Sequence, residues 1–440
     1  MAGFPPAGSP KAQMAANEQS AAGFPVPPLA RRLFALAGTG GFEARIVGGA
    51  VRDWLAGDRL DCGPDGRALV GDIDMAVAAP IEDFAQLCRD DGLRVIETGI
   101  DHGTVTIIDL APGAADESAI EVTQTRLDLE TDGRHAVVGF SDDWAADAER
   151  RDFTINAIYI RDDGSLDDPL GGIADLRDGR LRFAGEAARR VEEDALRMLR
   201  YCRFLPRFGA GGVDADAEAA IRSQAASASR LSGERVAAEC RRLFGMQGGD
   251  AGIRLMWESG LDEPALGTRL VPDNLAVLAG AGDLAVVAPD SRWLIRLAAL
   301  TPAARADALA DRLRLSRRDR RLLTGLGVTD AAEMADRLTS DAWRRTAYFL
   351  AGDGIPPPAV LIVAAARAGM ELKADHLAAL AGWVPPEAPL VAADLLSHGV
   401  DRGPALGEML RAAEAHWVAH DFTPSRQDLL AFVTDRPTHE

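Results

Sequence analysis

Two short stretches decide the interpretation of this 440-residue chain: Val47-Gly48-Gly49-Ala50-Val51-Arg52-Asp53 and, further along, Gly71-Asp72-Ile73-Asp74. Residues 45–47 predict a strand, the two glycines a tight turn, and the residues up to Gly57 a short helix. Such a turn lets a triphosphate approach the backbone, and the free N–H groups at a helix start favour its negative charge. Arg52 can add a charge-assisted hydrogen bond. The stretch is a candidate phosphate site, and an ordinary turn is the alternative.

Asp72 and Asp74 are two carboxylates at alternate positions of a predicted strand. Because side chains alternate along a strand, both point to one face, ~6.5 Å apart along the chain. Two such carboxylates beside a phosphate site can hold a pair of Mg²⁺ ions ~3.5–4 Å apart, which activate a hydroxyl and stabilise leaving pyrophosphate. A solvent-facing edge strand is the alternative, and the preceding Gly-Gly-x-x-Arg pattern argues against it.

Glu193 to Phe204 predicts an amphipathic helix with one apolar and one basic side. The apolar side consists of Ala195, Met198, Leu199, Cys202 and Leu205. The other side carries Arg197, Arg200 and Arg203, with Asp194 at its margin. We expect the apolar side to pack against the protein and the basic side to offer charge to a ligand.

Asp194 and Arg197 are three residues apart, which makes them neighbours on a helix. Cytosine and adenine present an exocyclic amino donor beside a ring-nitrogen acceptor, whereas uracil and guanine present a carbonyl beside an N–H. A carboxylate that accepts and a guanidinium that donates match only the first pattern. The pair could therefore select C and A, with Arg200 and Arg203 facing the triphosphate or the primer end. A surface ion pair on a solvated helix is the alternative.

Together these motifs resemble those of the class II CCA-adding enzymes and bacterial poly(A) polymerases, which are polymerase-beta-like nucleotidyltransferases. Besides the two opening stretches, the resemblance is carried by Arg150-Arg151-Asp152-Phe153-Thr154-Ile155-Asn156-Ala157, Asp168 to Leu176, Glu193 to Phe204 and Glu234 to Glu239. These stretches follow one another in the family's order over residues 44 to 245.

The resemblance implies a Mg²⁺-dependent enzyme that adds CCA, or part of it, to the 3′ end of tRNA from CTP and ATP and releases pyrophosphate. Asp72 and Asp74 become the catalytic metal ligands. The residues expected to bind the nucleotide are Gly48, Gly49, Arg52, Arg151, Asp194, Arg197, Arg200 and Arg203. The alternatives are a poly(A) polymerase and a catalytically silent tRNA-binding protein.

The predicted fold is α+β, with a nucleotidyltransferase head that contains a small mixed sheet, followed by an all-helical neck, body and tail. Short β-branched runs alternate with helical stretches up to about residue 160, and strand signals fade after Asp175. We expect a disordered tail over 1–28, the catalytic head over 29–165, the neck that selects the nucleotide over 166–250, and a body and tail that bind tRNA over 251–440.

Composition limits the partners. The net charge of −19 argues against non-specific nucleic-acid binding, so an RNA partner needs a local basic surface. The best candidate in the C-terminal half is the cluster Arg317-Arg318-Asp319-Arg320-Arg321, which lies in a run from Arg312 to Arg321 with six arginines and one aspartate. Glu121 is a candidate third carboxylate, and the polar segment from Asp128 to Phe140 predicts a mobile loop. In relatives, a loop here is tied to switching from CTP to ATP.

The four cysteines are scattered without paired spacing, which supports neither a zinc site nor a disulfide framework. No stretch approaches the ~20 apolar residues that a membrane span requires. We therefore expect a cytoplasmic protein without a membrane partner. The oligomeric state is not predicted.

Overall fold

The structure is a computed structural model that describes residues 23–57, 73–100, 103–110, 118–131, 136–280, 286–327, 330–340 and 343–434. The chain divides into two compact units, Met1–Ala228 and Ser229–Glu440. The first unit is mixed α and β and the second is helical throughout its described residues, so the predicted fold class is confirmed.

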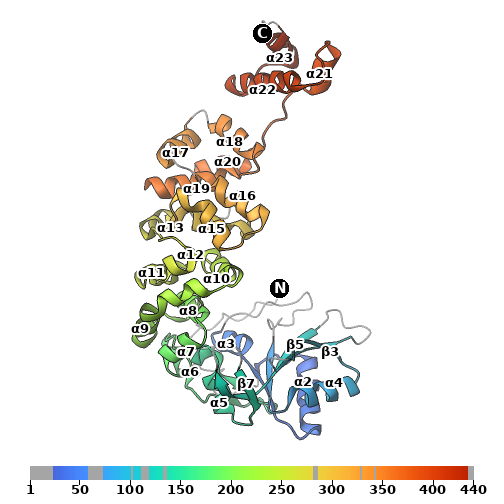
Figure 1. Cartoon of the computed structure of the whole chain (residues 1–440), viewed down its shortest axis with the longest axis vertical. Coiled ribbons are helices and arrows are strands. Elements are labelled where there is room, and N and C mark those ends of the chain that lie inside the picture. The colour runs from blue at the N-terminus through green and yellow to red at the C-terminus, as the bar shows by residue number, and fades with distance from the viewer. Residues whose placement is uncertain are drawn as a thin grey trace, which may run out of the picture. The chain divides into compact units, whose positions relative to one another are not determined.

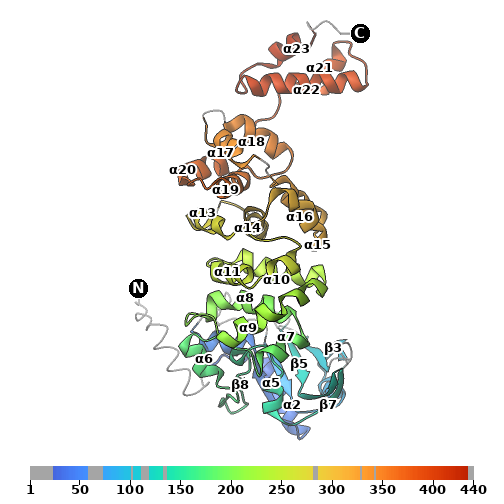
Figure 2. The ribbon, with the colours of Figure 1, turned by 60° about the vertical axis from the view of Figure 1, so that its left-hand side comes forward.

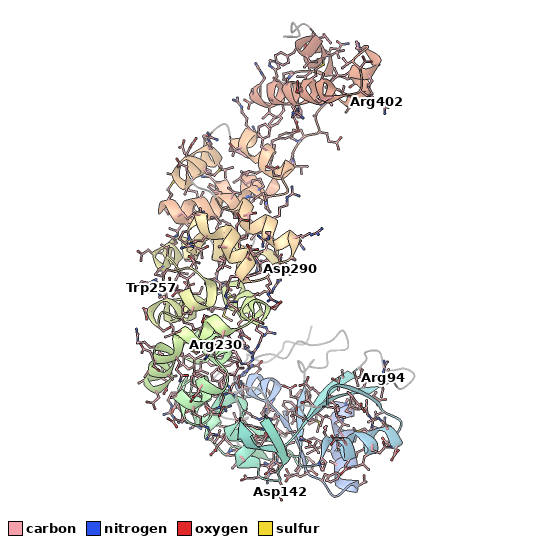
Figure 3. The ribbon with its side chains drawn as sticks, viewed as in Figure 1. Arg94, Asp142, Arg230, Trp257, Asp290 and Arg402 are labelled. Carbon is pink, nitrogen blue, oxygen red and sulfur yellow. The ribbon has the colours of Figure 1, made fainter. Side chains whose placement is uncertain are left out.

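A seven-stranded sheet forms the centre of the first unit, with the strand order β3-β4-β5-β2-β1-β8-β9 (Figure 1). Neighbouring strands are antiparallel except for β2 and β5, which are parallel. The strands are β1 Ala44–Val47, β2 Asp74–Val77, β3 Arg94–Gly99, β4 Thr104–Asp109, β5 Ser118–Gln124, β8 Tyr159–Ile160 and β9 Leu166–Asp167. A separate antiparallel ribbon joins β6 (Arg126–Thr131) to β7 (Ala136–Phe140). Arg94, labelled in Figure 3, begins the edge strand β3.

One face of the sheet is apolar and is covered by α2 (Pro28–Thr39) and α4 (Ile81–Asp90). Met75 and Val77 of β2 point to this face and are fully buried. Because side chains alternate, Asp74 and Ala76 point to the other face. There α5 (Trp144–Glu149) packs Trp144 and Ala148 against Ala76, which leaves the Asp74 end of the strand for the site.

The chain begins to pack before the end of the predicted tail. The tail was expected to reach residue 28, yet Phe24 is only 5% exposed and its ring lies 5.6 Å from that of Trp54. Pro28 begins α2, a position that proline tolerates because its missing N–H would have no helical partner. The contact forms because the apolar ring of Trp54, on a short helix, has to be shielded from water. The composition of residues 1–28 alone does not predict this contact.

Short helices connect the sheet to the end of the first unit, and Figures 1 and 2 show α5, α6 and α7 beside the sheet. They are η3 Thr154–Asn156, α6 Gly172–Asp178, α7 Ala187–Glu193, α8 Leu196–Phe208 and α9 Ala215–Gln224. Asp168 accepts from the N–H groups of Gly172 and Ile173 and so fixes the start of α6. A Cβ on Gly172 would lie 2.2 Å from the carbonyl oxygen of Thr154, which explains the glycine.

The predicted helix from Glu193 to Phe204 is wrong at its start. Asp194 ends α7 with an extended backbone, and α8 begins at Leu196. The Asp194 carboxylate accepts from the N–H of Leu196 at 3.0 Å, which is how a short polar side chain starts a new helix. Helical periodicity continues through the break, so the sequence pattern alone did not show it.

The second unit is built from helices that pack around buried aliphatic residues. Its helices are α10 Gly233–Gly245, α11 Asp250–Glu258, α12 Asp262–Leu266, α13 Leu275–Gly280, α14 Arg292–Leu300, α15 Ala306–Arg312, α16 Arg317–Gly325, α17 Ala331–Thr339, α18 Trp343–Gly352, α19 Pro357–Ala368, α20 Ala374–Gly382, α21 Ala392–Ser397, α22 Pro404–Ala419 and α23 Arg426–Thr434. Among the described residues, no single helix is long and apolar enough to cross a membrane, although α18 and α19 together, bent by 114°, meet the length and composition test.

Candidate active site

The phosphate turn and the aspartate strand meet at Gly48 and Asp74. Asp74 lies opposite Val47 in the antiparallel pair of β1 and β2, and the chain leaves β1 at Gly48 with φ of 87°. A Cβ on Gly48 would lie 3.1 Å from Oδ2 of Asp74. Glycine is therefore required twice here, for its backbone conformation and for the close approach of a carboxylate. The two opening motifs form one site.

A second carboxylate lies beside Asp74 on the same face of the sheet. Glu121 is the register partner of Asp74 in the parallel pair of β2 and β5, and Thr106 of β4 is the next residue across. Glu121 is exposed and Asp74 is half-buried. Asp72, the other predicted metal ligand, lies outside the described residues, and so does His135 of the predicted loop. Within the described residues there is no cluster of three or more His, Cys, Asp or Glu side chains that could hold a metal.

Arg52 is held between α3 (Gly49–Leu55) and α8. Its guanidinium donates to Asp53 at 2.7 Å and to the side-chain oxygen of Asn156 at 2.6 Å. The guanidinium carbon lies 4.9 Å from the ring centre of Phe204 and 4.7 Å from that of Phe208. Only 7% of the residue is exposed. The predicted phosphate contact is thus a buried arginine whose direction is set by α8.

Arg200, also predicted to contact the nucleotide, points from α8 to the head. Its Nε donates to Oδ2 of Asp152 at 2.9 Å, and Asp152 in turn accepts from the amide of Asn156 at 2.9 Å. Burial favours the neutral acid at Asp152, but the Arg200 guanidinium and the Asn156 amide outweigh it and lower the pKa of Asp152. The carboxylate therefore stays charged and joins η3 to α8.

Arg151 lies on the same side of the sheet as Asp74. It donates to Asp147 at 3.0 Å and to the hydroxyl of Tyr159 at 3.2 Å, and Tyr159 is the register partner of Val47, the strand neighbour of Asp74. Arg150 also donates to Asp147, at 2.8 Å. Burial alone would raise the pKa of Asp147, but the two arginines and the tyrosine lower it. Asp147 was not identified from the sequence, where it is one of several acids in a polar stretch.

Asp194 and Arg197, the pair predicted to select the base, have different partners from those expected of an intact helix. Arg197 donates to Glu193 at 2.8 Å and to the carbonyl oxygen of Arg190 at 2.6 Å. Asp194 is close in sequence but lies at the helix break rather than in α8. Arg203 is placed over the ring of Phe204, with 4.1 Å between guanidinium carbon and ring centre.

Arg190 was also missed. It is 5% exposed and donates to the carbonyl oxygens of Arg150 and Arg151, to the latter at 2.6 Å. Burial and the neighbouring Arg197 lower its pKa to about 10. It fixes the backbone that carries Arg151 and, through an ion pair with Glu193, the side chain that holds Arg197. A signal existed in principle, because an arginine on the apolar side of α7 needs carbonyl or carboxylate partners.

The described residues place Gly48 and Glu121 next to Asp74. Arg151 is linked through Tyr159 to the strand beside Asp74, whereas Arg52 and Arg200 are linked to each other through Asn156 and Asp152. The roles of these residues toward a nucleotide stay predictions.

Comparison with known proteins gives one consistent result. Residues 44–182 match the model of the "Poly A polymerase head domain", and residues 212–266 match the "Probable RNA and SrmB- binding site of polymerase A". The chain is 32% identical over 399 residues to the mitochondrial CCA tRNA nucleotidyltransferase 1 of Danio rerio, covering 89% of this chain and 87% of the relative. It is 30% identical over 400 residues to the CCA-adding enzyme of Lacticaseibacillus paracasei, covering 90% and 93%.

The solved structure of the Bacillus stearothermophilus CCA-adding enzyme in complex with CTP matches with a TM-score of 0.70 at 26% identity. The match covers 92% of this chain and 96% of that one. Similarity thus extends through both units and is not limited to the head.

Proposed function

The chain belongs to the CCA tRNA nucleotidyltransferases, or CCA-adding enzymes, and on that premise we propose that it adds CCA to the 3′ end of tRNA from CTP and ATP. The observation that supports this most directly is the packing of Gly48 against Asp74, with Glu121 as the register partner of Asp74. This packing supports the proposal because the predicted phosphate turn and two carboxylates lie at one point of the sheet. The 3′-hydroxyl of tRNA attacks the α-phosphate of the nucleotide, and pyrophosphate leaves.

Asp72 and Asp74 are the proposed ligands of Mg²⁺, and Glu121 is a candidate third ligand. Carboxylate oxygens are the type of donor that Mg²⁺ prefers, and those of Asp74 and Glu121 lie on one sheet face beside the turn. When bound, Mg²⁺ would lower the pKa of the attacking hydroxyl and neutralise the charge of the leaving pyrophosphate. The protein contributes position and charge: Arg151 and Arg52 are the proposed contacts to the phosphates, because Asp147 and Asn156 fix their directions.

Asp194 and Arg197 are proposed to read the base. The carboxylate would accept from the exocyclic amino group of C or A, and the guanidinium would donate to the ring nitrogen. Glu193 and the Arg190 carbonyl hold Arg197 in place, which lowers the entropy cost of an ordered hydrogen bond to the base. Uracil and guanine would place an N–H against Arg197 and a carbonyl against Asp194.

Transfer of labelled CTP and ATP to three acceptors tests the function. The acceptors are tRNA that ends before CCA, tRNA that ends after CC, and an unrelated RNA. We expect C, C and A on the first acceptor, A alone on the second and no addition to the third. Long A tracts on the unrelated RNA would indicate a poly(A) polymerase, and no pyrophosphate with any tRNA would indicate a silent tRNA-binding protein.

Replacement of Asp74 with Ala tests the role of the metal-binding carboxylates. We expect Asp74→Ala to lower the rate of nucleotide addition about 1000-fold or more, because the charge that would hold the metal is lost. Asp109→Ala is the matched control, since Asp109 is a strand aspartate that pairs with Arg32. Full activity of Asp74→Ala would contradict the proposed mechanism.

The compartment stays a prediction. The described cysteines, Cys88, Cys202 and Cys240, are buried thiols, which suits the predicted reducing cytoplasm. The relative from Danio rerio is named a mitochondrial enzyme. Fractionation with compartment markers would decide between the two.

A further inference from the structure

Asn156 connects two parts of the site that belong to separate sequence motifs. It is 7% exposed, and its side-chain oxygen accepts from Nη1 of Arg52 at 2.6 Å. Its amide nitrogen donates to Oδ1 of Asp152 at 2.9 Å. The buried side chain of Asn156 therefore links Arg52 of α3 to Asp152, which lies just before η3.

Asp152 continues this connection to α8. Its Oδ1 also accepts from the N–H of Phe153, while Oδ2 accepts from Arg200. The two carboxylate oxygens of Asp152 thus have different partners. Oδ1 accepts from Phe153 and Asn156, and Oδ2 accepts from Arg200 of α8. If the amide of Asn156 were lost, Oδ1 would keep one backbone donor and the direction of the carboxylate would be less well defined.

Arg52 meets α8 a second time through its flat face. The rings of Phe204 and Phe208 lie under the guanidinium, and Arg207 of the same helix lies 3.4 Å from Asp53, the other partner of Arg52. A guanidinium stacked on rings can still rotate in its plane, and a hydrogen bond at its edge prevents this. Asn156 supplies such a bond at Nη1, on the opposite edge from the bond that Asp53 makes at Nε.

We propose that Asn156 is a positioning residue that couples phosphate recognition by Arg52 to base selection by α8, an inference that rests on the proposed function. The chemistry requires an amide. Alanine makes neither bond, and aspartate still accepts from Arg52 but places a second carboxylate against Asp152. Because the two replacements break different halves of the connection, they should have different kinetic effects.

The test measures KM and kcat for CTP and ATP on tRNA acceptors, together with the ratio of kcat/KM for CTP to that for UTP. For Asn156→Ala we expect the KM of both nucleotides to rise about tenfold and the preference for CTP over UTP to fall about tenfold, since a hydrogen bond to a charged group is lost on each side. For Asn156→Asp we expect the nucleotide KM to stay within about threefold of wild type and the preference to fall as in the alanine variant.

Asn274→Ala is the matched control, because Asn274 is half-buried, lies in the second unit and donates one bond, at 2.7 Å, to the carbonyl oxygen of Ala299. It should keep wild-type kinetics. Thermal unfolding of every variant gives the folded fraction.

The proposal is overturned if kcat of Asn156→Ala falls only in proportion to that fraction while KM and base preference stay at wild type. It is equally overturned if Asn156→Ala and Asn156→Asp have the same KM for the nucleotides. Failure of the wild-type protein to use CTP or ATP would overturn the proposed function instead.

Discussion

Asp147 is a carboxylate without exposed surface that accepts from two arginines and one tyrosine. At the scale of the single residue, this kind of group decides how the site responds to acid. Asp147 and Asp152 both have pKa values lowered from the ordinary 3.8. A group with a lowered pKa in the folded state stabilises the protein above its unfolded pKa, and this contribution is lost as the pH falls through the folded pKa.

We therefore expect the free energy of unfolding to be nearly constant from neutral pH to about pH 5 and to fall below about pH 4. Asp147→Asn should lower the free energy of unfolding by about 3 kcal/mol at pH 7, because two arginines lose their buried partner. It should also lose less stability than wild type on acidification. Denaturant unfolding at pH 3.5, 5 and 7 measures both effects.

The control is Asp162→Asn, since Asp162 is exposed. It should follow the wild-type curve. An Asp147→Asn variant with the same acid dependence as wild type would show that this carboxylate is not responsible for the loss.

The residue scale also shows what the sequence can reveal. The face on which Asp74 lies follows from strand alternation, and the glycine next to it from the need for a phosphate turn. The partners of Arg52 and Arg151 could not be predicted, because Asn156 and Asp147 reach them only after the sheet and η3 have packed. Tertiary contacts of this kind leave no periodic signal.

At the scale of the element, the glycine that begins α6 matters because this helix packs directly on η3, with no space for a side chain between them. Gly172 faces the backbone of Thr154, and η3, which begins at Thr154, also carries Asn156. The position of this short turn therefore determines where Asn156 meets Arg52 and Asp152. A change in α6 can thus affect the site without touching it.

We expect Gly172→Ala to lower the free energy of unfolding by about 3 kcal/mol, because the added Cβ would lie 2.2 Å from a backbone oxygen and something must move. Nucleotide addition should fall as well, since η3 is displaced. Thermal unfolding and the labelled-nucleotide assay measure the two effects.

Gly38→Ala in α2 is the comparison, because nothing lies within 4 Å of a Cβ there. It should be neutral or stabilise the protein by up to about 1 kcal/mol, through the loss of backbone freedom in the unfolded chain. Equal stability of the Gly172 and Gly38 variants would mean that the turn adapts without cost.

The helix break at Asp194 is the clearest case at this scale of an element that periodicity misplaced. Helical spacing runs from Glu193 to Phe204, so a helix that begins at Glu193 was expected. An aspartate whose carboxylate accepts from the backbone two residues on can interrupt a helix without a glycine or proline. Asp194 and Arg197 therefore have partners that the expected helix did not predict, the N–H of Leu196 and the carboxylate of Glu193.

At the scale of the whole molecule, the second unit is predicted to supply the surface for a large polyanion in a protein of net charge −19. The structure separates the predicted arginine cluster into two kinds. Arg320 pairs with Asp311, and Arg314 pairs with Glu234 at 2.8 Å. Arg317 and Arg318 begin α16 and are exposed, so they are the stronger candidates for phosphate contacts.

We expect the double replacement Arg317→Glu and Arg318→Glu to raise the KM for tRNA about tenfold or more and to leave the KM for CTP unchanged. The dependence of log affinity on log salt should become shallower by about one unit for each lost phosphate contact. Arg89→Glu, an exposed charge reversal on α4 of the first unit, is the control. An unchanged tRNA KM would exclude this face of α16 from RNA binding.

The sequence predicted an α+β head followed by a helical part, because strands and helices each have their own periodicity of apolar residues. Which helices of the second unit meet RNA was not predictable, because the sequence shows charge but not its pairing. Asp319, within the same basic run, pairs with Arg241 of α10 at 3.3 Å and is thus part of the packing between helices.

The close approach of Gly48 to Asp74 has a consequence for how these two positions can change during evolution. A side chain at position 48 would press on the Asp74 carboxylate and strain the backbone, so we expect the two positions to depend on each other. Chimeras of related heads joined between positions 48 and 74 should stay active only where both parents bring the same spacing.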